Sequence, residues 1–167
     1  MIQNICNHVK QRIFKISNND YIKLKFFNFD KFYTAAKRML KPGGLIAVIG
    51  YGLISVNDSV DPWLLHFYKN ITGPYWDKER KYIDENYQTI PFPFREIKTP
   101  TFEMQFEWTS EILLGFLSSW SAVQHFRNKH NRDPIDEIQE EVISVWPGEE
   151  IKKVSFPLFI RAGIIEK

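Results

Sequence analysis

RMLKPGGLIAVIG, residues 38–50, carries the clearest fold signal in this chain. Its second half places five consecutive apolar residues, 45–49, between glycines, which is typical of a strand buried on both faces of a sheet. The Pro42-Gly43-Gly44 turn in front of that strand ends the helix that precedes it. Helix, turn and buried strand in this order form the second half of a βαβ unit. The stretch therefore predicts an α/β fold.

An apolar stripe at helical spacing leads into the turn. We expect Asn28 to cap this helix, and Lys37 and Arg38 lie near its C-terminal end, where cations favour the helix dipole. Before the helix, residues 21–27 alternate apolar side chains with lysines, a period of two that predicts a half-buried strand. The stripe consists of Phe29, Phe32, Tyr33, Ala36, Met39 and Leu40.

The rest of the chain continues with helical and strand patterns. Residues 91–94, Pro-Phe-Pro-Phe, predict a rigid extended linker, because each proline biases the residue before it away from helix. Residues 1–20 are polar and irregular, apart from an apolar cluster around 13–16. Strands are predicted at 102–108 and 154–165, and helices at 58–71, 77–87, 109–120, 122–129 and 133–145.

Composition favours one globular domain. The chain has 167 residues, of which 44% are hydrophobic and 16% aromatic, enough for a sizeable core. Its longest apolar run is too short to cross a membrane, and no apolar stretch follows the first basic residues as a secretory signal requires. The single cysteine, Cys6, excludes a disulfide framework and a cysteine-rich zinc site. We therefore expect a cytosolic or nuclear compartment, with cytoplasmic as the default.

The net charge of +2 hides an asymmetry. Residues 1–41 contain nine Lys and Arg and two Asp, so this segment is positively charged. Residues 42–167 contain thirteen Lys and Arg and eighteen Asp and Glu, so this segment is negatively charged. A basic segment on an acidic body can contact nucleic acid or an anionic membrane, or it can be a solvated face. The lysines are spread out and match no recognised nucleic-acid module, so we expect no nucleic-acid partner and no membrane partner.

The sequence lacks familiar catalytic and metal motifs. The glycines at 43–44 and 50–52 do not form the six-residue dinucleotide fingerprint, and no nucleophile elbow occurs. His125 and His130 lie five residues apart without a nearby third ligand, so we expect no metal. Glu140 and Glu141 are adjacent and point in different directions on a helix. These motifs therefore leave the catalytic residues unknown.

Aromatic side chains are frequent at the end of the buried strand and downstream of it. They can line an apolar pocket with polar handles, or they can pack in the core. Trp63, Trp108 and Trp120 suit core packing. Tyr51, which stands between two glycines, and the loop pair Tyr75-Trp76 suit a pocket as well as packing.

In order and spacing, residues 29–48 resemble the fourth helix and fifth strand of class I S-adenosylmethionine-dependent methyltransferases. The RMLKPGG turn before an apolar strand is the most specific part of the resemblance. Over residues 26–167 the resemblance implies a partial, Rossmann-like methyltransferase domain, with a basic N-terminal segment, 1–25, outside the match. Later stretches are similar to the small-molecule group that includes trans-aconitate methyltransferase: residues 61–68, 73–76, 108–123 and 156–160.

The resemblance covers only the C-terminal half of the family's domain. The family binds its cofactor through a glycine-rich loop after the first strand, an acidic residue that ends the second and a loop after the fourth. The first two have no counterpart in this sequence, so we expect a truncated form. At the third, where the family often has His-Trp-Phe, this chain has Lys25-Phe26-Phe27. The resemblance implies that Phe26 and Phe27 contact S-adenosylmethionine.

The activity implied by the resemblance is methyl transfer to an oxygen of a small molecule, a carboxylate or a hydroxyl. The sulfonium methyl group is already activated, so the protein mainly aligns the acceptor and excludes water. We place the acceptor pocket among Tyr51, Tyr75, Trp76 and Trp120. The alternative is a non-catalytic, truncated methyltransferase-like protein, either a binding or regulatory partner or a gene remnant.

A half-domain would leave the strand at 45–49 with an open hydrogen-bonding edge. Either the strand predicted at 21–27 covers this edge, or a second copy of the chain or another polypeptide does. Self-association or a partner chain is therefore an expectation for this edge of the sheet.

Overall fold

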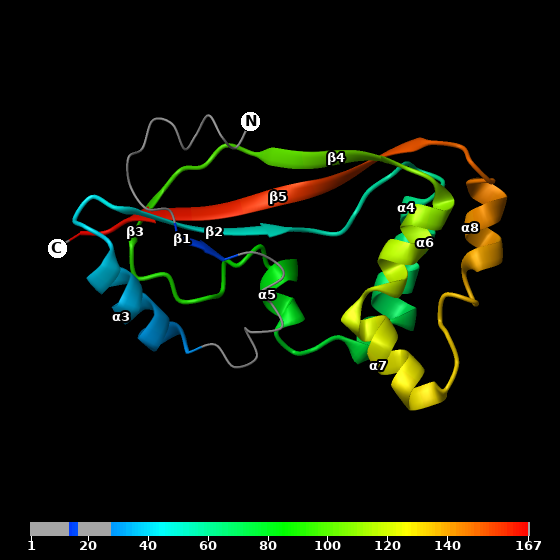
Figure 1. The fold of residues 1–167 in the computed structure, drawn as a ribbon, viewed down its shortest axis with the longest axis horizontal. Helices are drawn as coiled ribbons and strands as arrows, with labels where there is room; N and C mark the ends of the chain where they lie inside the picture. The colour runs from blue at the N-terminus through cyan, green and yellow to red at the C-terminus, as the bar shows by residue number, and fades with distance from the viewer. Residues whose placement is uncertain (1–13, 17–27, 167) are drawn as a thin grey trace. The chain divides into compact units, whose positions relative to one another are not determined.

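The computed structural model describes residues 14–16 and 28–166 (Figure 1). The strand predicted at 21–27 lies outside the described residues, as do Phe26 and Phe27. Within the described part, no helix is long and apolar enough to cross a membrane. In chain order the elements are β1 (Phe14–Ile16), α3 (Phe29–Met39), β2 (Leu45–Tyr51), α4 (Asp61–His66), the π-helix η2 (Phe67–Ile71), the 3-10 helix η3 (Gly73–Tyr75), α5 (Arg80–Asp84), β3 (Arg95–Ile97), β4 (Phe102–Trp108), α6 (Ser110–Ser118), α7 (Ser121–His130), α8 (Gln139–Val145) and β5 (Lys152–Ile164).

The strands form one mixed sheet in the order β1-β2-β5-β3, with β4 paired to β5 off this path. β1 runs parallel to β2. β2 and β5 run antiparallel, from Leu45 opposite Ile164 to Tyr51 opposite Leu158, and β3 pairs antiparallel with β5. The predicted α/β fold with a buried strand at 45–49 is confirmed. β2 has one parallel neighbour, β1, and one antiparallel neighbour, β5. The sequence did not reveal this mixed pairing.

The position of β1 corrects one prediction. Its three residues fall in the segment whose polar composition indicated irregular structure. The strand is defined by pairing with β2, 30 or so residues later in the chain, and composition carries no information about such a distant backbone partner.

The helix and turn before β2 follow the predictions. Asn28 caps α3, because its side-chain oxygen accepts a hydrogen bond from the Lys31 backbone N–H at 2.9 Å. One face of the helix buries Tyr33 and Ala36 in a core cluster shared with β2. In the turn, Gly43 has a φ of 75°, a left-handed conformation that favours glycine. The turn therefore needs the glycine that the sequence places there.

The described residues divide into two compact units. We call them the sheet unit, which comprises the described residues up to Gly52, Lys81–Phe102 and 158–166, and the helical unit, which comprises Leu53–Arg80 and Glu103–Pro157. The sheet unit contains α3, β2 and β3, and the helical unit contains α4, α6, α7 and α8. Each unit has buried side chains of its own.

The helical unit has a fully buried core. The predicted helices at 58–71, 109–120 and 122–129 are confirmed in position, and each contributes to this core. The side chains that are 0% exposed in this unit include Leu64, Phe67, Leu113, Leu117, Val123, Val142 and Trp146.

The helix predicted at 133–145 begins later than expected, as α8 at Gln139. Asp133 does not cap a long helix. One carboxylate oxygen accepts from the Ile135 backbone N–H at 3.0 Å, and the other pairs with Arg127. Residues 134–138 form turns instead. The start was predicted wrongly because an aspartate that closes a local turn has the same sequence pattern as a helix cap.

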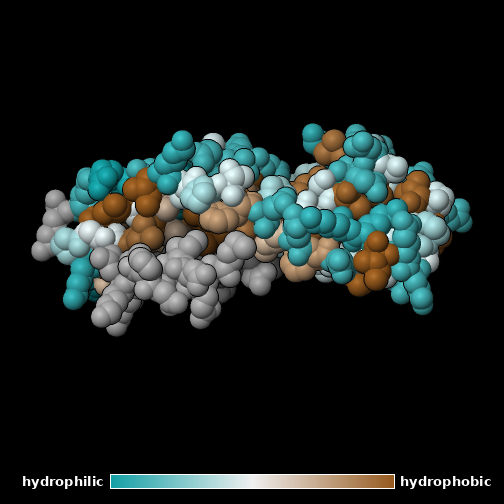
Figure 2. All heavy atoms as spheres, turned by 90° about the horizontal axis from the view of Figure 1, so that it is seen from above, coloured by the Kyte–Doolittle hydropathy of each residue, from teal (hydrophilic) through white to brown (hydrophobic). Residues whose placement is uncertain are grey.

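Large apolar side chains are also exposed on the helical unit. On the face seen in Figure 2 they are separated by polar side chains and form no continuous patch. Scattered apolar side chains of this kind are usual on protein surfaces. The exposed set in this unit includes Leu65, Phe106, Ile112, Ile143 and Ile151.

Candidate functional site

The carboxyl end of β2 is the end at which α/β sheets generally bind ligands. Tyr51 ends β2, lies opposite Leu158 of β5 and is half-buried. The residue before it, Gly50, has no room for a side chain, since a Cβ there would lie 2.2 Å from the Phe159 ring and 2.9 Å from that of Tyr87. These two rings meet edge to face with centroids 4.9 Å apart. A pair of aromatic rings therefore covers Gly50, next to the predicted acceptor residue Tyr51.

Arg161 on β5 stabilises the turn that contains Tyr87. It is 8% exposed, and its Nη1 donates to the carbonyl oxygens of Tyr87 at 2.7 Å and Ile90 at 3.0 Å. The guanidinium also pairs with Glu96. Asn86 and Tyr87 have φ angles of 51° and 59°, a conformation that bulky residues rarely adopt. The hydrogen bonds from Arg161 offset the strain of this turn.

Tyr33 on α3 supports the segment that follows this turn. Its Oη donates to the Pro91 carbonyl at 2.5 Å, and the residue is 3% exposed. Burial raises the pKa of Tyr33 to about 12, although the positive charge of Arg161 acts to lower this pKa. Tyr33 is therefore a neutral hydrogen-bond donor at physiological pH and does not suit the task of a general base.

In the helical unit, three aromatic side chains and one arginine form what we call the Trp76 cluster: Tyr68, Trp76, Trp120 and Arg80. The centroids of Trp76 and Trp120 are 5.4 Å apart, and Tyr68 lies 5.3 Å from Trp76 and 5.8 Å from Trp120. The Arg80 guanidinium lies 4.4 Å from the Trp76 centroid and 5.0 Å from that of Tyr68, and its Nε donates to the Tyr68 hydroxyl at 2.7 Å. Aromatic faces beside a guanidinium hold planar and anionic groups well.

The local sequence explains how this cluster forms. The wider π-helical turn of η2 buries two successive side chains, Phe67 and Tyr68. Its end is closed by the buried Thr72, whose hydroxyl donates to the Phe67 carbonyl at 2.9 Å. Gly73-Pro74 then turns the chain back, so that the Trp76 indole N–H donates to the Tyr68 carbonyl at 3.3 Å. π-Helical turns are frequent at functional sites.

Tyr75 belongs to a different group of side chains. Its ring packs on Phe126 at 5.0 Å, and its hydroxyl lies 2.6 Å from Nε2 of His130. His125 donates from Nδ1 to the Tyr75 carbonyl at 2.8 Å. Both histidines lie on α7, so Tyr75 is held by that helix.

The structure thus brings together only part of the predicted acceptor site. Trp76 and Trp120 are in ring contact, and Tyr75 packs against α7. Tyr51 belongs to the sheet unit. The predicted cofactor contacts, Phe26 and Phe27, lie outside the described residues.

Sequence reasoning missed Tyr68, Arg80 and Arg161. Tyr68 fell within the helix predicted at 58–71, and Arg80 fell within the helix predicted at 77–87, and neither pattern distinguished them from structural residues. The available signals were small: an arginine four residues after Trp76, and a lone arginine inside the apolar strand at 154–165.

The described residues do not by themselves form a site that fits S-adenosylmethionine, the cofactor that the resemblance implies. The glycine-rich loop and the acidic residue that the family uses have no counterpart in this sequence. Gly50, the glycine at the end of β2, is covered by the rings of Phe159 and Tyr87 and so offers no open backbone turn. No step is therefore assigned to the cofactor here.

Comparison with known proteins points to methyltransferases. A scan against known protein families finds no match. A protein of Dictyostelium discoideum named "putative methyltransferase" is 29% identical over 142 residues, which cover 81% of this chain and 54% of that protein. A solved structure titled as a "putative type II methyltransferase" from Anaeromyxobacter dehalogenans matches with a TM-score of 0.83 and 31% identity. The match covers 92% of this chain and 64% of that one.

This chain is homologous to part of these proteins. It spans about half the length of the Dictyostelium relative and less than two thirds of the solved chain. The mixed sheet with helices, predicted as part of a methyltransferase fold, matches part of the solved structure. The names of the two relatives state no acceptor.

Proposed function

We propose that this chain forms the acceptor side of an S-adenosylmethionine-dependent methyltransferase that acts on an oxygen of a small molecule. The observation that supports this most strongly is the match to the Anaeromyxobacter dehalogenans structure, which combines a TM-score of 0.83 with 31% identity and covers 92% of the chain. The RMLKPGG turn also supports the proposal, because the turn ends α3 and leads into the buried strand β2 as the resemblance implies.

The acceptor binds at the Trp76 cluster in this proposal. The faces of Trp76 and Trp120 exclude water from an organic acceptor, and the positive charge of Arg80 favours a carboxylate. A carboxylate is deprotonated at neutral pH, so its methylation needs no strong general base. Alignment of the acceptor is then the main task of the protein.

Other predicted residues keep their proposed roles. Tyr51 at the end of β2 and Tyr75 beside α7 contribute to acceptor binding, and Phe26 and Phe27 contact the cofactor. Under this assignment, Tyr51→Ala weakens use of the acceptor more than it weakens cofactor binding. The reverse pattern in a paired measurement of KM for the acceptor and Kd for the cofactor would contradict the assignment.

A methyl-transfer assay tests the proposal. The 167-residue chain is incubated with S-adenosylmethionine that carries a tritiated methyl group and with a panel of small carboxylic acids and alcohols. We expect label in a small-molecule ester or ether. Arg80→Met is expected to lower transfer to carboxylic acids by about tenfold, the effect of one lost charge-assisted contact.

The matched control is Arg132→Met. Arg132 lies in the same unit and also lies over an aromatic ring, that of Phe126 at 5.3 Å, but it is outside the Trp76 cluster. We expect its activity to equal that of the parent chain. Equal losses in both variants, or no labelled small molecule with any acceptor, would contradict the proposed site.

A second candidate function is that of a non-catalytic binding or regulatory partner. The observation that favours it is the packing at the carboxyl end of β2, where the rings of Phe159 and Tyr87 cover Gly50 and leave no open backbone turn for a cofactor. A folded chain that binds S-adenosylhomocysteine no better than a mixture of adenosine and homocysteine would support this second candidate.

A further inference from the structure

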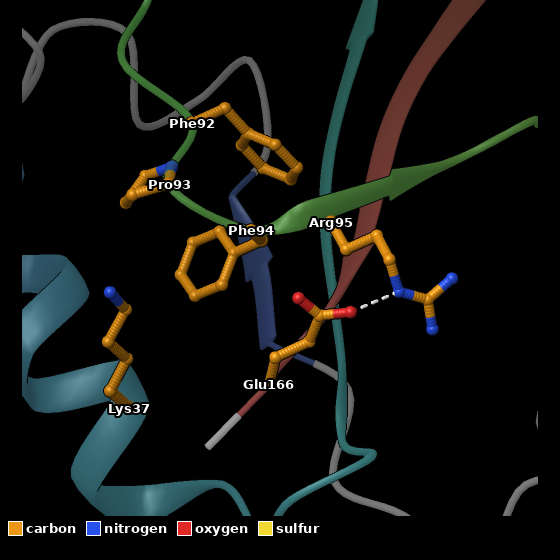
Figure 3. Close-up of a pocket in the computed structure, with 6 residues that line it drawn as sticks. All are labelled: Lys37, Phe92, Pro93, Phe94, Arg95 and Glu166. Atoms are coloured by element: carbon orange, nitrogen blue, oxygen red, sulfur yellow. Dashed lines mark hydrogen bonds and ion pairs between the residues drawn. The ribbon is translucent and has the colours of Figure 1, made fainter.

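A pocket lies in the sheet unit, at the opposite end of β2 from Tyr51. Its volume is about 440 Å³, and it is lined by Lys37, Phe92, Pro93, Phe94, Arg95 and Glu166. Figure 3 shows the Lys37 amine, the Phe94 ring and the Glu166 carboxylate around one space, whereas the Arg95 guanidinium extends past Glu166 to the other side. In the sheet, Arg95 of β3 lies opposite Ile164 of β5, and Ile164 lies opposite Leu45 of β2. The pocket therefore lies near the first residue of β2. None of its lining residues belongs to the proposed acceptor site.

The aromatic wall of this pocket is rigid. It is formed by Phe92, Pro93 and Phe94 of the Pro-Phe-Pro-Phe segment at 91–94, in which both prolines restrict the backbone. Phe92 and Phe94 pack edge to face at 5.2 Å, and Phe94 meets the buried Tyr33 ring at 5.2 Å. Gly163 lets the wall approach the sheet, since a Cβ there would lie 2.8 Å from both Phe92 and Phe94.

The polar side of the pocket has a net positive charge. Arg95 pairs with Glu166 in a solvent-exposed ion pair, with side-chain exposures of 56% and 61%. Lys37 lies 5.7 Å from the Phe94 ring and forms no ion pair with any residue that the structure describes. Lys37 therefore places a cationic charge next to the aromatic wall.

We propose that this pocket binds small aromatic carboxylates. The carboxylate pairs with Lys37, and the aromatic ring packs on the wall formed by Pro93 and Phe94. An anion without an aromatic ring contacts only Lys37, and an uncharged aromatic molecule contacts only the wall. Each therefore makes only one of the two contacts that an aromatic carboxylate makes. This proposal does not depend on methyl transfer, because the pocket shares no residue with the Trp76 cluster or with the proposed cofactor contacts.

Nuclear magnetic resonance titration of the isotopically labelled 167-residue chain tests the proposal, with benzoate as the probe. We expect saturable shifts of the backbone amides of Lys37, Phe94, Arg95 and Glu166. The expected Kd is on the order of 1–10 mM, as for a ligand of this size on an open site. Benzyl alcohol, which keeps the ring without the charge, and acetate, which keeps the charge without the ring, should each bind at least about threefold more weakly.

Two variants sharpen the result. Lys37→Gln should weaken benzoate binding about three- to fivefold, the usual effect of losing one exposed ion pair. Arg38→Gln removes the same charge from the neighbouring position in the last turn of α3 and should leave the Kd unchanged. Shifts centred elsewhere, equal binding of acetate or benzyl alcohol, or equal effects of the two variants would overturn the proposal.

Discussion

At the scale of single residues, Gly50 shows how closely the sheet unit is packed at the end of β2. A Cβ at this position would overlap the Phe159 ring and press on Tyr87. We expect Gly50→Ala to lower the free energy of unfolding by about 1–3 kcal/mol, because an added methyl group in a filled space forces its neighbours to move. Urea unfolding followed by circular dichroism measures the change.

Gly115 provides the control for this substitution. It lies within α6 and is exposed, and a Cβ there would have no atom within 4 Å. Gly115→Ala is expected to raise the free energy of unfolding by about 0.5–1 kcal/mol, since alanine restricts the unfolded chain and favours helix. If both substitutions changed stability by the same amount, the packing assigned to Gly50 would be wrong.

The buried Tyr33 predicts a pH dependence of stability. Its pKa is about 12 in the folded chain, against 10.0 for an ordinary tyrosine. The folded state therefore keeps the phenol proton between these values while the unfolded state loses it. Stability is fully present below pH 10 and falls as pH rises toward 12, by at most about 3 kcal/mol from this group.

Comparison with Tyr33→Phe isolates this effect. The variant loses the hydrogen bond to Pro91 and should be about 1 kcal/mol less stable at neutral pH. Its free energy of unfolding should fall less steeply than that of the parent chain between pH 10 and 12. Parallel curves for the two proteins would show that the Tyr33 phenol is not buried as described.

At the scale of elements, Arg161 ties the turn at 86–90 to β5. Arg161→Met removes the donor to the carbonyls of Tyr87 and Ile90 and leaves Glu96 without its partner. We expect a loss of about 2–4 kcal/mol in the free energy of unfolding. Arg95→Met, which breaks an exposed pair with Glu166, should cost less than about 1 kcal/mol. Thermal unfolding of both variants would contradict this account if Arg95→Met were the more damaging.

The elements that sequence predicted well are those with a strong local signal. The stripe on α3 and the apolar run of β2 have periods that depend only on neighbouring residues. The start of α8 was wrong because the Asp133 side chain bonds locally and to Arg127. β1 was missed because its definition depends on a distant strand.

The candidate site was harder to predict than the elements, for a related reason. Trp76 and Trp120 were singled out by residue type, but their contact joins positions 44 residues apart. Arg161 reaches carbonyls 71 and 74 residues away. Periodicity carries no information about such contacts, so Tyr68, Arg80 and Arg161 became visible only in the folded chain.

At the scale of the whole molecule, the predicted acceptor residues are divided between the two units. Tyr51 belongs to the sheet unit, whereas Tyr75, Trp76 and Trp120 belong to the helical unit. The similarity to the solved Anaeromyxobacter dehalogenans chain extends over 92% of this chain and therefore includes both units. Both units are thus part of the methyltransferase likeness on which the proposed function depends.

Calorimetric titration of S-adenosylhomocysteine into the purified 167-residue chain tests the proposed methyl transfer most directly. We predict one-site binding in the micromolar range, for which Phe26 and Phe27, outside the described residues, complete the cofactor site. Phe27→Ala should weaken this binding and Trp120→Ala should leave it intact, because the first is assigned to the cofactor and the second to the acceptor. Circular dichroism establishes that each variant is folded. A folded parent chain that releases no heat of binding, even at about 1 mM cofactor product, would contradict the proposed function.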